Sequence, residues 1–177
     1  MMKKRTLKPS ELEELRVLVD YQLGLGAGKV LIPSLDRVLV TVSPNTLRIR
    51  NVYVDGKLAF SIRAGDSKII LHIYGGYLLW RNYSKYPKVI IVDEISEFIA
   101  DGGNVFAKHV LHIDDYLRAG DEVIIINEQS NLLAVGTLKL SPTEILSFTY
   151  GEAVRVREGV KKLNILNPNL NYGGQRG

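Results

Sequence analysis

The chain has 177 residues, of which 46% are hydrophobic and 24% are charged, with a mean hydropathy of +0.03 and a formal net charge of +4. This composition is typical of a globular protein and excludes a disordered or fibrous chain, and the length allows one full domain or two small ones. No apolar run reaches the roughly 18 residues of a membrane span, and the absence of cysteine excludes disulfides, thiolate zinc sites and cysteine nucleophiles.

The first predicted element is an amphipathic helix over residues 10–23. Ser10 and Glu13 have the spacing of a capping box, and apolar residues recur with helical period as far as Gly24. The next segment, GLGAGK, is similar to a phosphate-binding loop, but it lacks the Ser or Thr that must follow the lysine. We therefore expect a helix stop and a turn there, with no helix after it.

Four short β-type runs follow, and they predict an antiparallel sheet on which the helix packs. The runs cover residues 38–42, 46–54, 57–63 and 68–73, with Asp55-Gly56 and Gly65-Asp66 as hairpin turns. Alternation in the second run places Arg48 and Arg50 on one face and apolar residues on the other. Arg63 and Lys68 would extend this basic face to match phosphates, although solvated charges on a strand are at least as common.

An aromatic segment, YGGYLLWRNYSKY over residues 74–86, ends this half of the chain. Its four tyrosines and Trp80 are interleaved with Arg81 and Lys85, an arrangement that suits stacking on unpaired bases. The same rings could instead join two domains. We favour the joining role, because the segment directly precedes the start of a second predicted domain.

The second half begins with a strand over residues 88–92, whose continuous apolar run predicts burial on both faces. A short helix over residues 95–99 follows. Ser141, at the start of a later helix, is expected to cap it, with Ile145, Leu146 and Phe148 facing the core. The remaining expected elements are a turn and strand over 120–126, a hairpin through 127–131, its returning strand over 133–136, and a final strand within 151–159.

A glycine turn, Asp101-Gly102-Gly103, ends the short helix of the second half. Glycine permits positive φ and lets a ligand approach the backbone closely. The amides of Gly103 and Asn104 can therefore donate to phosphate or base edges, and Lys108 can neutralise a phosphate.

The final strand, AVRVR, alternates Val154 and Val156 inward with arginines outward. Two lysines follow it, and four cations on one edge predict a phosphate site. These cations are Arg155, Arg157, Lys161 and Lys162. Residues 164–177 are polar and turn-rich, and we expect them to form a flexible tail.

Charge is divided unevenly along the chain. Residues 1–86 carry 14 Lys or Arg and 7 Asp or Glu, whereas residues 87–177 carry 9 and 12. The first half therefore has a net charge of +7 and the second a net charge of −3. This asymmetry predicts that the first half supplies much of any sequence-independent attraction to phosphate, unless the charge serves solubility alone.

Three motifs of the second half, GGNVFAKHV, GDEVIIINEQSNLLAVG and GEAVRVREG, resemble in order and spacing the PUA domain, named after pseudouridine synthases and archaeosine transglycosylases. The resemblance covers residues 87–163. The first half, through DYQLGLGAG and TLRIRNVYVDGKLAFSIRAGDSKIIL, resembles the small α/β domain that precedes the PUA domain in archaeal tRNA-guanine transglycosylase and its archaeosine-synthase relative. The resemblance implies an α+β protein: an N-terminal helix on a small antiparallel sheet over residues 1–86, then a PUA-type β-barrel with short helices.

The resemblance also implies an RNA-binding surface. In the family the glycine turn and the segment after it form part of the RNA-contacting surface, which carries over to Gly102, Gly103, Asn104, Phe106, Lys108 and His109. From their charge, the cations of the last strand and its end join them as predicted RNA contacts: Arg155, Arg157, Lys161 and Lys162. Possible further contacts, again predicted from charge, are Arg48, Arg50, Arg63 and Arg81. Phe106 by itself is of a type more often found in a core. In the family that the chain resembles, the small α/β domain and the PUA domain grip the tRNA acceptor arm and help expose a D-loop guanine to a separate catalytic barrel.

The barrel, its catalytic aspartates and its cysteine zinc site are not in this sequence. The acidic pairs at 114–115 and 121–122 have no histidine or cysteine partner, and His109 and His112 have no third ligand, so we expect no enzyme activity, no cofactor and no metal. We therefore expect a cytoplasmic, tRNA-binding accessory module or detached subunit for archaeosine-type tRNA modification. An RNA-binding factor in ribosome assembly or translation and a protein-interaction adaptor remain as alternatives.

Overall fold

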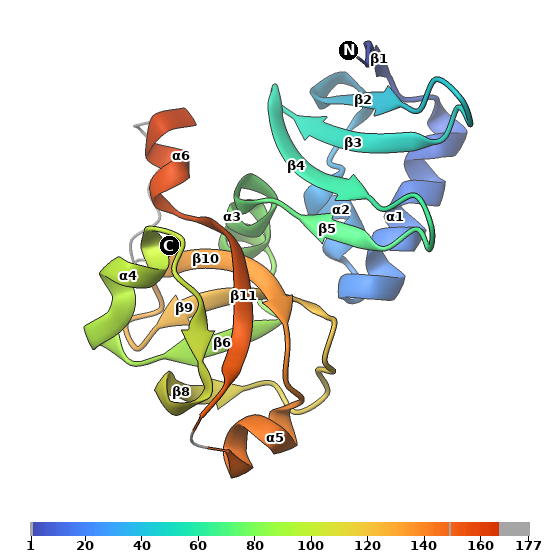
Figure 1. Cartoon of the computed structure of the whole chain (residues 1–177). Coiled ribbons are helices and arrows are strands. Elements are labelled where there is room, and N and C mark those ends of the chain that lie inside the picture. Colours follow the sequence, from blue (N-terminus) through green and yellow to red (C-terminus); the bar gives the residue numbers. More distant parts are fainter. Residues whose placement is uncertain (1, 149, 167–177) are drawn as a thin grey trace. The chain divides into compact units, whose positions relative to one another are not determined.

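The computed structural model describes residues 2–148 and 150–166, and the chain divides into two compact units, Met1–Tyr86 and Pro87–Gly177 (Figure 1). We call them unit 1 and unit 2. Within the described residues, no helix is both long and apolar enough to cross a membrane. Of the tail predicted over residues 164–177, the first three residues continue a helix, and the rest lie outside the described residues.

Unit 1 consists of a five-stranded antiparallel sheet with helices α1 and α2 on one face and α3 at its end (Figure 1). The strand order is β1-β2-β3-β4-β5. The elements are β1 (Lys4–Thr6), α1 (Pro9–Leu23), α2 (Ala27–Leu31), β2 (Val38–Val42), β3 (Ile49–Val54), β4 (Lys57–Ile62), β5 (Ile69–Leu71) and α3 (Ile73–Asn82), with a 3₁₀ turn at Leu35–Arg37.

Helix α1 starts slightly earlier than the sequence pattern predicts. Pro9 takes the first helical position, and the carboxylate of Glu11 accepts a hydrogen bond of 2.8 Å from the backbone N–H of Lys8. The capping box predicted at Ser10 and Glu13 is therefore wrong by two residues. The predicted stop is present, because Gly24 has φ +118°, but the short helix α2 follows it where no helix was expected.

The core of unit 1 lies between α1, α2 and one face of the sheet. Leu15, Val19 and Leu23 are the buried positions of α1, and Val40 and Phe60 of the neighbouring strands both pair with Val52 of β3. The β3–β4 hairpin turns at Asp55-Gly56, whose φ angles of 49° and 79° are those of a two-residue type I′ turn, as the sequence predicts.

The aromatic segment forms most of α3, and its rings are largely inside the protein. Tyr74, Trp80 and Tyr86 are buried, and Trp80 is only 1% exposed. Tyr77 contacts both Tyr74 and Trp80, with ring centroids about 6 Å apart. A buried ring cannot stack on a base, so base stacking by Trp80 is excluded in this arrangement.

Unit 2 is built on a six-stranded sheet that curves into a nearly closed barrel (Figure 1). The strand order is β7-β11-β10-β9-β6-β8, and all neighbours are antiparallel except β6 and β9. The elements are β6 (Lys88–Ile91), α4 (Ser96–Ala100), β7 (Val105–Phe106), β8 (Val110–Ile113), β9 (Glu122–Asn127), β10 (Leu132–Leu138), α5 (Pro142–Ser147), β11 (Glu152–Gly159) and α6 (Lys161–Leu166), with 3₁₀ turns at Asp93–Ile95 and Ala107–His109.

Two burial predictions for unit 2 are wrong. Strand β6 alternates between part-buried and buried residues instead of being buried on both faces. Ser141 caps α5 as predicted, but α5 buries Ile145 and exposes Leu146 and Phe148. A six-residue helix has too few turns to hold three apolar residues against the core, so only one of them is covered.

Candidate nucleic-acid interface

The glycine turn after α4 separates into two positions with different roles. Gly102 has φ +106° and open space where a Cβ would lie. Its N–H donates to the carbonyl of Ile99 and that of Gly103 donates to the carbonyl of Phe98, each at 2.9 Å, so the prediction of a free amide at Gly103 is wrong. At Gly103, in contrast, a Cβ would lie 2.6 Å from Cδ1 of Phe98. The ring of Phe98 is 56% exposed and occupies the space that was predicted to admit a ligand. Gly103 therefore makes room for a side chain of its own unit.

A second close approach, which the sequence reasoning missed, holds this turn against the last strand. A Cβ on Gly159 would lie 2.7 Å from the carbonyl carbon of Ala100 and 2.9 Å from the backbone nitrogen of Gly102. The end of α4 therefore contacts β11 at a residue that must lack a side chain. The signal in the sequence was the glycine that closes GEAVRVREG, but nothing there indicated its partner.

The side chain of Asn104 links the turn to the last strand. Its side-chain oxygen accepts a hydrogen bond of 2.9 Å from the backbone N–H of Val156, and its side-chain nitrogen donates one of 3.2 Å to Glu152. Glu152 also binds Arg155, whose Nε donates at 2.9 Å. Asn104, Glu152 and Arg155 thus form a continuous polar network, with Arg155 as its exposed end.

Arg157 does not point outward as the alternation predicts. A β-bulge shifts the pairing of β10 and β11 next to it, and its guanidinium lies 2.5 Å from Oε1 of Glu122, whose side chain is only 2% exposed. Thr137 also donates a hydrogen bond of 2.8 Å to Glu122 and accepts one of 2.9 Å from Arg157. The arginine compensates a buried carboxylate, which is a structural role.

The two lysines after the strand are also paired. Lys161 lies 2.5 Å from Glu97 and 2.8 Å from Asp101, and hydrogen bonds to Asp101 and then Glu97 raise its pKa. Lys162 lies 2.6 Å from Glu158. The four predicted cations of this edge therefore face five carboxylates, so they add little net positive potential.

The segment after the turn offers more accessible groups. Phe106 lies on edge strand β7 and is 43% exposed, so it is not part of the core. Lys108 is exposed and makes no ion pair within residues 2–148 and 150–166, whereas His109 is part-buried and its carbonyl accepts a hydrogen bond of 3.1 Å from Val92. Residues 107 and 151 are joined by a backbone hydrogen bond of 2.9 Å.

Two further exposed rings lie close in sequence to Gly151, whose carbonyl accepts the hydrogen bond from Ala107. Phe148 and Tyr150 stack with centroids 6.0 Å apart, and both are exposed. Sequence reasoning assigned Phe148 to the core and overlooked Tyr150. The aromatic spacing was visible in the sequence, but its exposure depends on how short α5 is.

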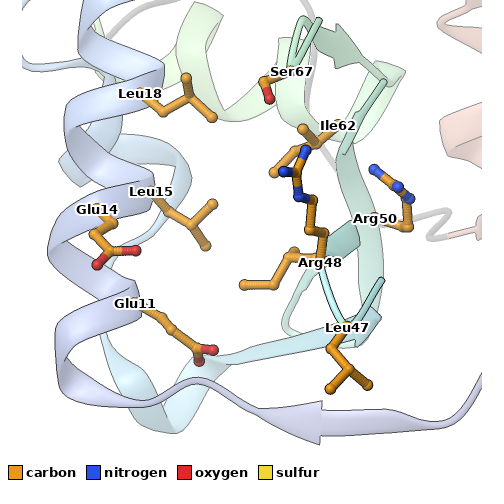
Figure 2. A pocket seen from close by; sticks show the side chains of 10 residues that line it. Glu11, Glu14, Leu15, Leu18, Leu47, Arg48, Arg50, Ile62 and Ser67 are labelled. Atoms are coloured by element: carbon orange, nitrogen blue, oxygen red, sulfur yellow. The ribbon is translucent and has the colours of Figure 1, made fainter. Parts of the chain in front are cut away.

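The four arginines of unit 1 that were predicted as possible RNA contacts do not lie on one surface. Arg48 and Arg50 both line a pocket of about 300 Å³ between α1 and the sheet, which Figure 2 shows from close by. Leu47 has φ 58°, so a turn continues to Arg48 and strand β3 starts only at Ile49. Arg63 is paired with Asp66 in the turn before β5, and the basic face predicted from Arg48 to Arg63 is therefore interrupted. Arg81 is exposed on α3.

The pocket has an apolar floor and charged walls. One wall comes from α1, and the facing wall comes from the β2–β3 turn, β3, β4 and the β4–β5 turn (Figure 2). The full lining is Glu11, Glu14, Leu15, Leu18, Leu47, Arg48, Ile49, Arg50, Ile62 and Ser67. In the part of the chain that the structure describes, no group of three or more His, Asp or Glu residues is arranged to hold a metal ion.

Comparison with known families assigns both halves of the chain. Residues 13–87 match the patch-forming domain C2 of tRNA-guanine transglycosylase, and residues 87–160 match the PUA domain. Relatives include the tRNA-guanine(15) transglycosylases of Methanothermobacter thermautotrophicus, 36% identical over 84% of this chain, and of Methanobrevibacter smithii, 39% identical over 86%. The chain spans only 23% of the length of either relative.

Solved structures show the same arrangement of elements. A hypothetical protein from Pyrococcus horikoshii superposes with a TM-score of 0.67 at 19% identity, covering 90% of this chain and 95% of its own. A conserved PUA domain protein from Thermoplasma acidophilum gives 0.61 at 20% identity, covering 89% and 93%. At these identities the likeness concerns the fold. The two domain matches show that the chain combines a C2-type domain with a PUA domain, and in this it is similar to the C-terminal region of archaeal tRNA-guanine transglycosylase.

Proposed function

We propose that this protein is a non-catalytic tRNA-binding module that grips the acceptor arm and acts with a separate catalytic subunit in archaeosine-type tRNA modification. The observation that carries the proposal is the pairing of a C2 domain with a PUA domain in a chain that matches less than a quarter of each enzyme relative. Those relatives are named for the transfer reaction on tRNA guanine 15.

On unit 2 we propose that RNA contacts the accessible groups around the turn and strand β7. These are the backbone of Gly102 and the side chains of Phe106, Lys108 and Arg155, all exposed or open. A lysine and an arginine suit phosphate oxygens, and an exposed ring suits an unpaired base at an RNA end. The N–H groups of Gly102 and Gly103 donate instead to the carbonyls of Ile99 and Phe98, each at 2.9 Å, so the backbone of Gly102 can offer only its carbonyl oxygen. The side chains of Asn104 and Arg157 bind other residues of unit 2, so we assign them a structural role and not a contact with RNA.

The test is binding of the purified protein to tRNA at several salt concentrations, comparing intact molecules with molecules that lack the 3′ CCA end. A grip on the acceptor arm predicts loss of affinity on trimming, and it predicts that Lys108→Ala lowers the salt dependence by about one phosphate contact. Equal affinity for intact tRNA, trimmed tRNA and ribosomal RNA would refute the acceptor-arm grip and point to a role on the ribosome. Absence of binding to all three would leave a protein-interaction role.

A further inference from the structure

The pocket of unit 1 combines features that a surface between a helix and a sheet does not need for folding. Leu15 and Ile62 are buried at its base, while Leu18 and Ile49 are part-exposed to it. Its volume of about 300 Å³ lies at the lower end of the range found for small-ligand pockets. It therefore has room for one planar group against an apolar floor.

The charges around the pocket are not all neutralised internally. Glu11 is held by Arg5, whose two guanidinium nitrogens donate at 2.9 Å and 2.8 Å, and this bond lowers the pKa of Glu11 to about 2. Glu14 and Arg48, by contrast, form no ion pair with any residue that the structure describes. Arg50 has only a long 3.5 Å hydrogen bond to Thr46. One carboxylate on α1 and two guanidinium groups opposite it remain available for a ligand.

These three groups match one class of ligand. Guanidinium groups bind phosphate and stack on base rings, and they do so better than ammonium groups. A carboxylate accepts hydrogen bonds only, and guanine is the base that presents two adjacent donors, N1–H and N2–H₂, on its pairing edge. An unpaired guanine would thus lie on the apolar floor, donate to Glu14 and place its phosphate near Arg48 and Arg50.

We propose that this pocket binds one unpaired guanine nucleotide, supplied by the bound RNA. The proposal deepens the proposed function and rests on it for the source of the nucleotide. The chemistry of recognition is the same for a nucleotide in RNA and for a free guanosine monophosphate, and the two sources are separated by experiment.

The first experiment measures binding of 5′-GMP, 5′-AMP, 5′-CMP and 5′-UMP to the full chain by saturation-transfer NMR. The wild type is expected to prefer GMP. Glu14→Gln should reduce that preference about tenfold, the usual size of a two-bond base contact, and Arg48→Glu should weaken all four. Lys29→Glu, on the exposed face of α2 and outside the pocket lining, is the matched charge control and should change nothing.

The second experiment measures tRNA affinity of the same variants. The backbone carbonyl of Arg48 accepts a hydrogen bond from Ser43, which the substitution leaves in place, and the Arg48 side chain is exposed, so the variant is expected to fold. Arg48→Glu should bind tRNA about tenfold more weakly than Lys29→Glu, with a shallower salt dependence. Thermal unfolding checks that both variants retain wild-type stability.

The outcomes distinguish the two proposals. The pocket proposal is overturned if Arg48→Glu and Lys29→Glu bind tRNA equally and no variant changes the relative affinity for GMP. If the wild type still binds tRNA in that case, the proposed function stands. If GMP binds selectively while tRNA does not bind at all, the proposed function and the RNA source both fail, and the pocket is a site for a free nucleotide. Selective GMP binding with weaker tRNA binding by Arg48→Glu supports both.

Discussion

Replacing Arg157 tests whether this arginine stabilises unit 2 or contacts RNA. Arg157→Met removes the guanidinium that is ion-paired with Glu122, whose side chain is 2% exposed, and keeps the hydrogen bond that the hydroxyl of Thr137 donates to it. Breaking a buried ion pair by removing one partner costs about 3–5 kcal/mol. Because the Thr137 bond remains and Arg157 itself is 24% exposed to water, we expect about 2–4 kcal/mol of destabilisation in unit 2. Arg155→Met, on a largely exposed pair with Glu152, should cost less than about 1 kcal/mol.

The assay must report on unit 2. The single tryptophan, Trp80, lies in unit 1, so its fluorescence follows the other unit. Hydrogen exchange of the amides in β10 and β11, measured at increasing denaturant, gives the free energy of opening for the strands that hold Arg157. Adding Glu122→Met to Arg157→Met should restore much of the lost stability, because no buried charge then remains. A loss as small as that of Arg155→Met, together with a large fall in tRNA affinity, would refute the structural role and return Arg157 to the RNA-binding surface.

Three other outcomes are expected. Gly159→Ala should destabilise unit 2 by at least about 2 kcal/mol in denaturant titrations, because the new Cβ would meet the backbone of Ala100. Gly102→Ala should cost only roughly 1–2 kcal/mol, because its Cβ would meet no atom and only the left-handed backbone conformation is unfavourable. Equal losses would contradict the close approach. Glu11, whose pKa falls from 4.5 to about 2 beside Arg5, stabilises unit 1 above pH 4.5 and loses that contribution as the pH falls toward 2. Glu11→Gln should flatten this acid limb of a pH series of thermal unfolding, and an unchanged limb would exclude the pair as its cause.

The features that could be predicted from the sequence are those that depend on neighbours in the chain. The periods of 3.6 and 2 located α1 and strands β2 to β5 of unit 1, and Asp55-Gly56 located a hairpin turn, because these signals are local. The three-residue strand β1 is too short to show a period and was not predicted. Side-chain partners are not local. Arg157 finds its carboxylate 35 residues away, and a β-bulge, which alternation cannot anticipate, turns it inward.

The same distinction applies to the candidate site. The glycine turn was predicted from its letters, but whether each glycine serves a ligand or a neighbouring ring depends on Phe98, which the pattern assigned only to a helix. The pocket of unit 1 combines α1 with a turn and strands more than 20 residues later in the chain, so no motif could reveal it. Arg48 and Arg50 were predicted to share a basic strand face. In the structure both line the pocket, and Arg48 precedes strand β3.

The ion pairs change how the charge division of the chain should be interpreted. The first half carries a net charge of +7 and the second −3, and the four cations once expected to attract phosphate on unit 2 face five carboxylates. Long-range attraction of RNA should therefore come mainly from unit 1, where Arg48 and Arg50 lack strong internal partners. Unit 2 would contribute short-range contacts through exposed backbone, Phe106 and a few cations, which depend on shape more than on salt. We therefore expect the salt dependence of tRNA affinity to stay steep when Lys161 and Lys162 are replaced by Ala, and to become shallower when Arg48 is replaced.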